Sequence, residues 1–329
     1  MKIFQGVNEI AGQMGMFAGE LRKNNCDVTC YNTFHSYLGY EDNLINLERE
    51  ELNKNVDTIL TEYDVYHFHY AQTLNDDFSD LKALQANGKK AVMHHWGNDV
   101  RFHEQAKERN PFAYTGDSPA NEVMHERLTA ISKVIKEAIV QDYEVYEYVK
   151  PYYDRVHVLP IAVQFEKVAQ TESVSNDIPL LLHAPTNPLF KGTEHVEAAV
   201  HRLAKEFSFE YVRIEQKHHE EALDQYKQAD LIIDQVLCGS YGLLSVEAMA
   251  MGKPVVTYVR DDLLPTFPEI PPIINANPAN LYEKVRYLLK YPDVLNAYGR
   301  QGRRYAKKYH DIKVVAEQLM SIYEGLKPL

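Results

Sequence analysis

The chain is poor in cysteine, has a single tryptophan and contains no long apolar run. Its three cysteines, Cys26, Cys30 and Cys238, are too few for a disulfide framework and do not have the spacing of a zinc site. No stretch approaches the roughly 18 apolar residues of a membrane span. The opening residues MKIFQGVNEI reach Asn8 and Glu9 before the apolar region of a signal peptide develops. We therefore expect a cytoplasmic protein without a targeting segment.

Positive charge is also scarce. The chain has 35 Lys and Arg against 47 Asp and Glu, a formal net charge of −12, so it lacks the basic footprint that nucleic-acid binding requires. The segment Lys284–Lys308 is a local exception. It is either a solvated helical face or a site of weak peripheral contact with an anionic membrane surface, which would place the protein at the inner face of the cell membrane. Its basic residues are Lys284, Arg286, Lys290, Arg300, Arg303, Arg304, Lys307 and Lys308.

What the sequence does have is a regular alternation of short apolar strands and amphipathic helices, which is typical of an α/β fold with a parallel sheet. The polar segment Val168–Pro179 interrupts the alternation, which then restarts, and we interpret that segment as a linker. This organisation predicts two doubly wound, Rossmann-like domains facing a cleft. The expected domains are residues 1–165 and 175–310, with a C-terminal helix at about 312–329 returning to the first domain.

Two local features of the chain are also predicted, a loop in the first half and a helix start in the second. Phe102–Asn121 is polar and rich in turn residues, and we expect it to be a long functional loop. Thr193 is expected to be the N-cap of a helix that runs to Phe207.

The segment Gly239–Val256, GSYGLLSVEAMAMGKPVV, is the most informative one. A glycine-containing turn opens a short helix that Gly252 and Pro254 close. Backbone N–H groups at such a helix start form an anion site without basic side chains. The turn and the helix start comprise Ser240, Tyr241, Gly242, Leu243 and Leu244. Glu247, further along the helix, is placed either to accept hydroxyl groups of a ribose or simply to stabilise the helix start.

A second segment, His183–Glu194 (HAPTNPLFKGTE), follows a strand and precedes a helix. In open α/β folds this is the sheet edge at which ligands bind. Lys191 beside Gly192 suits a diphosphate, because a mobile ammonium stands next to a permissive backbone. Thr186 and Asn187 lie in the same loop and complete the predicted donor-binding set.

Together these segments resemble the retaining GT-B glycosyltransferases of family four (glycosyltransferase group 1). The second domain carries most of the resemblance. The first shares the turn AGQMG, the strand YHFHY and the segment HHWGNDVR. The resemblance implies that Lys191 contacts a donor diphosphate and that Glu247 contacts the nucleotide ribose. It also implies that the turn with Gly12 and Gln13 closes over the diphosphate.

The chain departs from that family at two positions. Gly239 stands where the family often has a first glutamate that touches the donor sugar, and Thr186 stands where it tends to have an arginine. Arg213 and Arg101 are candidates for the missing positive charge.

The resemblance further implies a histidine and an acid near the donor sugar. The acid is Asp99, and either His94 or His95 is the histidine. His67 and His69 alternate on one strand, and we predict no metal site from them because further ligands at suitable spacing are missing.

The expected function is therefore metal-independent, retaining transfer of a sugar from a nucleotide-diphosphate donor, UDP rather than GDP, to an acceptor hydroxyl. No separate cofactor is expected. The resemblance suggests a glycan or lipid-linked acceptor in surface glycan or polysaccharide biosynthesis. Two alternatives stay open: a sugar-nucleotide epimerase of the same fold, and a catalytically inactive partner subunit that binds nucleotide sugar.

Overall fold

The structure is a computed structural model that describes residues 1–168 and 178–329. Most of the predicted linker Val168–Pro179 lies outside the described residues. The chain divides into two compact units. Unit 1 comprises Met1–His103, Ser118–Pro160 and Ile312–Leu329, and unit 2 comprises Glu104–Asp117 and Ile161–Asp311. The helix near the C-terminus, α14 (Ile312–Gly325), thus belongs to unit 1.

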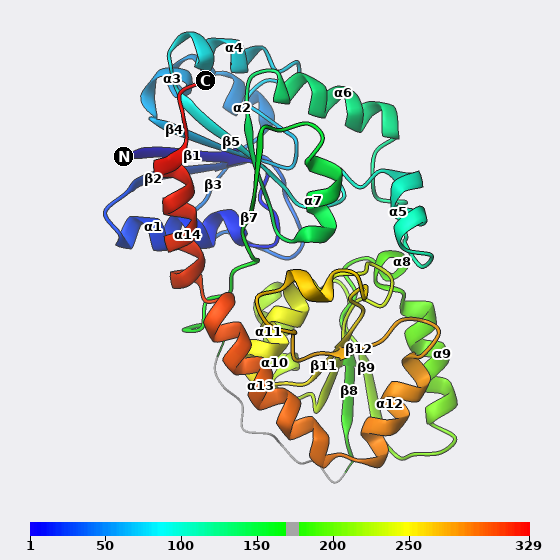
Figure 1. Ribbon diagram of the computed structural model, residues 1–329. Coiled ribbons are helices and arrows are strands. Elements are labelled where there is room, and N and C mark those ends of the chain that lie inside the picture. The colour runs from blue at the N-terminus through cyan, green and yellow to red at the C-terminus, as the bar shows by residue number, and fades with distance from the viewer. Residues whose placement is uncertain (169–177) are drawn as a thin grey trace. The chain divides into compact units, whose positions relative to one another are not determined.

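Unit 1 is a seven-stranded sheet in the order β3-β2-β1-β4-β5-β6-β7, in which each pair is parallel. From β1 the chain steps to β2 on one side and later to β4 on the other. Because crossovers between parallel strands are right-handed, these opposite steps place helices on both faces, with α1 beside α14 on one of them (Figure 1). Its strands are β1 (Lys2–Val7), β2 (Asp27–Asn32), β3 (Ile45–Asn46), β4 (Val65–His69), β5 (Lys90–His95), β6 (Glu137–Val140) and β7 (Arg155–Val158). The helices of this unit before α14 are α1 (Gln13–Lys23), α2 (Arg49–Asn53), α3 (Val56–Glu62), α4 (Ser79–Ala86), α6 (Asn121–Ser132) and α7 (Tyr143–Val149). Between α4 and α6 in the chain lies α5 (His103–Arg109), which belongs to unit 2 except for its first residue.

Unit 2 is a five-stranded parallel sheet in the order β12-β11-β10-β8-β9. Two apolar clusters form its core, one with α10, α11 and α13 and the other with α9 and α12. The strands are β8 (Leu180–His183), β9 (Glu210–Arg213), β10 (Leu231–Ile233), β11 (Val255–Thr257) and β12 (Ile274–Asn275). The helices are α8 (Pro188–Lys191), α9 (Thr193–Leu203), α10 (His219–Tyr226), α11 (Leu243–Met251), α12 (Leu281–Lys290) and α13 (Asp293–Tyr309), with a short 3-10 helix at Leu264–Thr266.

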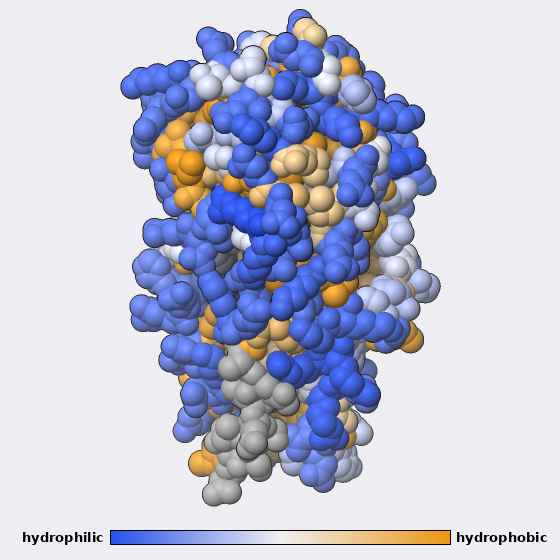
Figure 2. All heavy atoms as spheres, turned by 90° about the vertical axis from the view of Figure 1, so that its left-hand side faces the viewer, coloured by the Kyte–Doolittle hydropathy of each residue, from blue (hydrophilic) through white to orange (hydrophobic). Residues whose placement is uncertain are grey.

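Burial follows this layered arrangement. Every residue of β4 and β10 is buried, because both faces of a parallel sheet are covered by helices. Hydrophilic side chains dominate the face drawn in Figure 2. None of the helices in the described residues is long and apolar enough to cross a membrane.

Two local predictions were wrong. The segment Phe102–Asn121 is not one long loop, since it contains α5 and the first residue of α6. Asn110 explains why much of it groups with unit 2: its side-chain amide donates to the backbone oxygens of Leu237 and Cys238. Thr193 is not an N-cap but the first residue of α9, whose N-cap is Gly192 at φ 78°.

Candidate functional site

The order of the strands in unit 2 marks one edge of its sheet as a binding site. From β8 the chain steps to β9 on one side and then to β10 on the other. The loops that follow β8 and β10 therefore leave neighbouring strands in opposite directions. In open α/β sheets this switch point, at the carboxyl ends of the strands, is where ligands bind. Both predicted donor segments begin here.

The loop after β8 holds Lys191 in place. Asn187 caps α8, its Oδ1 accepting the N–H groups of Leu189 and Phe190, and α8 ends at Lys191. Gly192 follows at φ 78°, and a Cβ there would lie 2.6 Å from Val236 Cγ2. Glycine is therefore required at this position, which keeps the Lys191 loop against the segment that follows β10.

Lys191 is buried, with 8% of its surface exposed, and its ammonium group is paired. Nζ lies 2.6 Å from Asp234 Oδ1 and 2.9 Å from Gln235 Oε1. The other oxygen of Asp234, Oδ2, accepts hydrogen bonds from Ser245 Oγ at 2.6 Å and from the Ser245 backbone N–H at 3.2 Å. One buried carboxylate thus joins Lys191 to the first turn of α11.

The predicted turn leads into α11 as expected. Gly242 is the N-cap of α11 and offers no side-chain cap. Asp234 accepts the Ser245 N–H, which leaves the earlier N–H groups of the first turn for a ligand. Ser240 and Tyr241 are buried, and the Tyr241 hydroxyl lies 3.0 Å from His310 Nε2. Leu243 and Leu244 are the first two residues of the helix.

Gly239 cannot be replaced by the family's glutamate without rearrangement. Its φ is +89°, and a Cβ would lie 2.8 Å from Arg260 Cγ and 3.1 Å from Asn110 Nδ2. Arg260 is itself buried and forms a bidentate pair with Asp262. A side chain at position 239 would therefore require the Arg260 side chain beside this turn to move.

The two arginines considered from the sequence are already engaged. Arg213 bonds Glu197 at 2.8 Å and Glu215 at 2.7 Å. Arg101 forms a buried pair with Glu144 at 2.8 and 2.9 Å in unit 1. Each guanidinium is thus neutralised by neighbouring carboxylates.

Glu247 has a partner that the sequence did not suggest. Its Oε1 lies 2.5 Å from Nε2 of His219, and His219 is the first residue of α10. Burial opposes a charge on His219, but the charge of Glu247 and its hydrogen bond raise the pKa of that imidazole above its ordinary value. A ribose at Glu247 would therefore meet a carboxylate–imidazole pair.

In unit 1 the switch point lies between β1 and β4, and Glu9 occupies the loop after β1. Its oxygens accept the backbone N–H groups of Met14 at 3.2 Å and Gly15 at 2.8 Å, in the first turn of α1. Burial raises the pKa of Glu9 to about 8, although these backbone bonds act in the opposite direction. Gly12 is the N-cap of α1 at φ 74°, and Gln13 is its buried first residue. The amides that a diphosphate would use at this turn already hold a carboxyl group.

The adjacent histidines of β5 differ in their surroundings. His95 is fully engaged, with Nδ1 at 2.7 Å from Asp99 Oδ2 and Nε2 at 2.9 Å from the Tyr153 hydroxyl. Asp99 also accepts backbone N–H groups through its other oxygen. His94 uses Nδ1 toward His67, whereas its buried Nε2 has no partner among the described residues. Of these two adjacent histidines, His94 is therefore the one that has a ring nitrogen without a partner in the described part of the chain.

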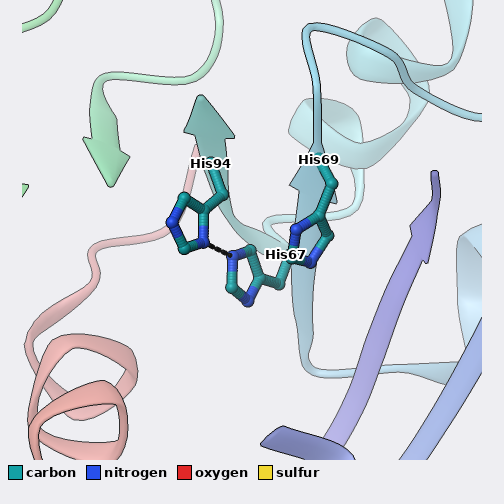
Figure 3. A group of neighbouring side chains, drawn as sticks. All are labelled: His67, His69 and His94. Carbon is teal, nitrogen blue, oxygen red and sulfur yellow. Dashed lines mark hydrogen bonds between the residues drawn. The ribbon is translucent and has the colours of Figure 1, made fainter. Parts of the chain in front are cut away.

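His67, His69 and His94 form a buried cluster on β4 and β5, with one nitrogen of each within 4.8 Å of the others (Figure 3). The rings of His67 and His94 are nearly parallel and share a hydrogen bond of 3.2 Å, while those of His67 and His69 stack with their centroids 4.2 Å apart. Tyr323 of α14 bonds His67 Nδ1 at 2.7 Å, and Trp96 donates to His69 Nδ1. Burial lowers the pKa of His69 to about 3. Burial lowers the pKa of His67 and His94 as well, so the three rings are neutral, and their nitrogens form a cluster of metal-ligand type that the spacing along the sequence did not predict.

The structure thus gathers the predicted residues of unit 2 at one sheet edge, and it adds others. Thr186, Asn187, Lys191, Gly192, the α11 start and Glu247 all follow β8 or β10. Asp234 was recognisable as a polar residue directly after an apolar strand. The partnership of His219 with Glu247, 28 positions apart, leaves no local signal in the sequence.

Comparison with known proteins finds a family match over part of the chain. A model of the glycosyl transferase-like family matches residues 195–321, which include Asp234 and α11 but not Lys191. A search of curated proteins finds no match.

Solved structures share the fold over the whole chain. Sucrose-phosphate synthase from Thermosynechococcus elongatus has 14% identity and a TM-score of 0.67, with 98% of each chain covered. Anabaena HepE in complex with UDP and glucose has 11% identity and a TM-score of 0.68, with 99% of each chain covered. UDP-GlcNAc 2-epimerase from Neisseria meningitidis has 12% identity and a TM-score of 0.55, covering 98% of this chain and 99% of the other. The two parallel sheets with their helices are the GT-B fold.

Proposed function

We propose that the protein is a glycosyltransferase that moves a sugar from a nucleoside diphosphate, UDP in the first instance, to an acceptor hydroxyl. One observation carries the proposal: Lys191 and the start of α11, joined by Asp234, meet at the switch point of the sheet. The glycosyl transferase-like match covers most of this unit. Structures of the same fold include one in complex with UDP-glucose.

The chemistry follows from the charges of this site. In transfer, the bond between the anomeric carbon and the diphosphate oxygen breaks, and a bond from that carbon to the acceptor oxygen forms. The acceptor proton passes to the departing diphosphate. Negative charge builds on the diphosphate, and Lys191 together with the α11 amides would stabilise it. Glu247 would hold the ribose, which does not change in the reaction.

Three finer features belong to the proposal. Retention of anomeric configuration is supported by the resemblance of the Lys191 and Glu247 segments to family four. Independence of a metal is supported by Lys191 and the helix amides, which supply the positive charge. An acceptor in surface glycan or polysaccharide synthesis rests on the resemblance alone.

A sugar-nucleotide epimerase is the second candidate, since the Neisseria epimerase shares the fold over the chain. An epimerase would change its nucleotide sugar without an acceptor and would leave the glycosyl–diphosphate bond intact in the product. A transferase releases UDP only when an acceptor is present. An inactive partner subunit would bind UDP without either reaction.

The experiment starts with thermal unfolding of the protein in UDP, GDP, ADP and their sugars. A ligand that binds only the folded state raises the melting temperature by mass action. At a ligand concentration of a hundred times Kd, it adds about 2.7 kcal/mol to the free energy of unfolding. We expect stabilisation by UDP, followed by acceptor-dependent UDP release from a UDP-sugar. Stabilisation by none of these nucleotides would contradict the proposal.

A further inference from the structure

Asp234 is a fully buried carboxylate that stands between two groups suited to bind phosphate. It directly follows β10, and its backbone N–H donates to Val256 in the neighbouring strand at 2.8 Å. One oxygen holds Lys191 and the other holds Ser245 at the start of α11. A carboxylate repels a phosphate, so Asp234 itself is not a phosphate ligand.

The pairing has a physical rationale. A buried carboxylate is costly unless a cation and hydrogen-bond donors compensate it. Here Asp234 has an ammonium, a hydroxyl and a backbone N–H. Lys191 Nζ carries three N–H bonds, and two of them are directed at Asp234 and Gln235. The third is left for a ligand.

We propose that Asp234 is a positioning residue for the diphosphate of the donor, acting through Lys191 and the N-terminus of α11. This inference rests on the proposed function, because it takes a nucleoside diphosphate as the ligand. By bonding both elements, Asp234 fixes the distance between the ammonium and the helix amides. It also cancels the charge of Lys191 while the site is empty, which limits how tightly the departing nucleotide is held.

Turnover and affinity should therefore respond differently to Asp234→Asn. The amide oxygen can still accept from Ser245, but Lys191 loses its ionic partner and its fixed place. We expect turnover to fall at least tenfold. UDP affinity should not weaken, because a negative charge beside the diphosphate has been removed.

A double-mutant cycle tests whether Asp234 acts through Lys191. Lys191→Ala leaves the Asp234 carboxylate uncompensated next to the diphosphate, so we expect UDP affinity to fall at least tenfold. Adding Asp234→Asn should recover at least fivefold of that loss and should lower turnover no further. Affinity is measured by calorimetry with UDP and with inorganic diphosphate, and turnover by UDP release. The same pattern with inorganic diphosphate would place the effect at the phosphates rather than at the nucleoside.

The matched control is Asp80→Asn in unit 1. Asp80 is equally buried and accepts from the Thr73 hydroxyl and the Leu74 N–H, but it has no lysine partner. It should change thermal stability only. The inference is wrong, and Asp234 is a structural residue, if the effects of Lys191→Ala and Asp234→Asn on UDP affinity and turnover simply multiply in the double mutant. It is equally wrong if UDP affinity and melting temperature fall together in Asp234→Asn. If wild-type protein binds neither UDP nor inorganic diphosphate, the proposed function fails and the inference fails with it.

Discussion

Lys191 and Glu247 are expected to contribute to different steps, because only one of them faces a group whose charge changes. Lys191→Ala removes an ammonium that stabilises the departing diphosphate, and such losses commonly lower turnover by about a hundredfold. Glu247→Gln weakens a hydrogen bond to ribose. Losing a bond to a charged group costs about 1.5–3 kcal/mol, so UDP affinity should fall about tenfold to a hundredfold with little change in turnover at saturating donor. Calorimetry should show weaker UDP binding in both variants, so turnover measured by UDP release at saturating donor is what separates them: it should fall in Lys191→Ala and change little in Glu247→Gln.

A lysine from the solvent-exposed surface of the same unit provides the control for this prediction. Lys205 is exposed, and Lys205→Ala should alter neither affinity nor turnover. Near-normal turnover in Lys191→Ala would mean that the loop after β8 is a surface turn and that the donor binds elsewhere.

Glu9 should make stability depend on pH in a direction unusual for a carboxyl group. Burial raises its pKa from an ordinary value of 4.5 to about 8. The folded protein therefore keeps a proton that the unfolded chain has released, so the contribution of Glu9 to the free energy of unfolding is full below pH 4.5 and is lost as the pH rises toward 8. Each pKa unit corresponds to about 1.4 kcal/mol, so a loss of a few kcal/mol is expected.

Glu9→Gln removes this titration but leaves an oxygen for the α1 amides. Its free energy of unfolding, measured in denaturant between pH 5 and 8, should fall less with pH than that of the wild type. The exposed Glu51→Gln serves as control. Equal slopes for wild type and Glu9→Gln would show that Glu9 is ionised across the range.

At the scale of elements, helix α11 depends on close contact with α13. A Cβ on Gly299 would lie 2.1 Å from the backbone oxygen of Gly252, at the end of α11, and one on Gly302 would lie 3.1 Å from Met249 Cγ. The Gly252 carbonyl belongs to the backbone, so it cannot move aside by a change of rotamer as a side chain could. Gly299→Ala should therefore separate the two helices and cost about 1–3 kcal/mol of stability, the range found for overpacked sites.

Gly325 offers a matched control for this substitution. It is the last residue of α14, and a Cβ there would meet nothing within 4 Å. Gly325→Ala should leave the midpoint of chemical denaturation nearly unchanged. A Gly299→Ala protein as stable as wild type would show that α13 can shift along α11 without loss.

Sequence patterns predicted the bounds of helices and strands better than they predicted which side chains pair with one another. The apolar runs predict strands at Lys90–His95 and Leu180–His183, and the glycine stop predicts a helix over Leu243–Met251. The structure has β5, β8 and α11 with these bounds, because local backbone preferences decide where such elements end. The Lys191–Asp234 and Glu247–His219 pairs depend on which strands are neighbours, and the alternation of strands and helices does not fix that order. Glu9 was overlooked because a lone acid after a strand has no distinctive spacing, although burial makes it unusual.

At the scale of the whole molecule, the net charge of −12 opposes contact with anionic lipids, while α12 and α13 carry local positive charge. Part of that charge is already neutralised, since Arg286 pairs with Glu206, Lys307 with Asp311 and Lys308 with Glu269. We predict that any binding to anionic vesicles is weak and electrostatic. The exposed basic residues that would contribute are Lys284, Lys290, Arg300 and Arg304.

Sedimentation with phosphatidylserine vesicles at rising salt checks this prediction. Exposed charges are screened over about 8 Å at physiological ionic strength, so binding should disappear as salt increases. Neutral vesicles are the control. Binding that persists in high salt would instead indicate insertion of apolar side chains. The cytoplasmic location expected from the cysteine content stays a prediction.

The interleaving of the two units along the chain has a consequence for the order of synthesis. Unit 1 includes α14, whose Tyr323 is fully buried and bonds His67, so its core lacks a helix until α14 has left the ribosome. Unit 2 is complete in sequence at Asp311. Although domains generally fold from the N-terminus during translation, here the half encoded first is finished last. A nascent chain arrested at Asp311 and allowed to emerge fully should therefore protect unit 2 from protease while β4 and β5 remain open to cleavage.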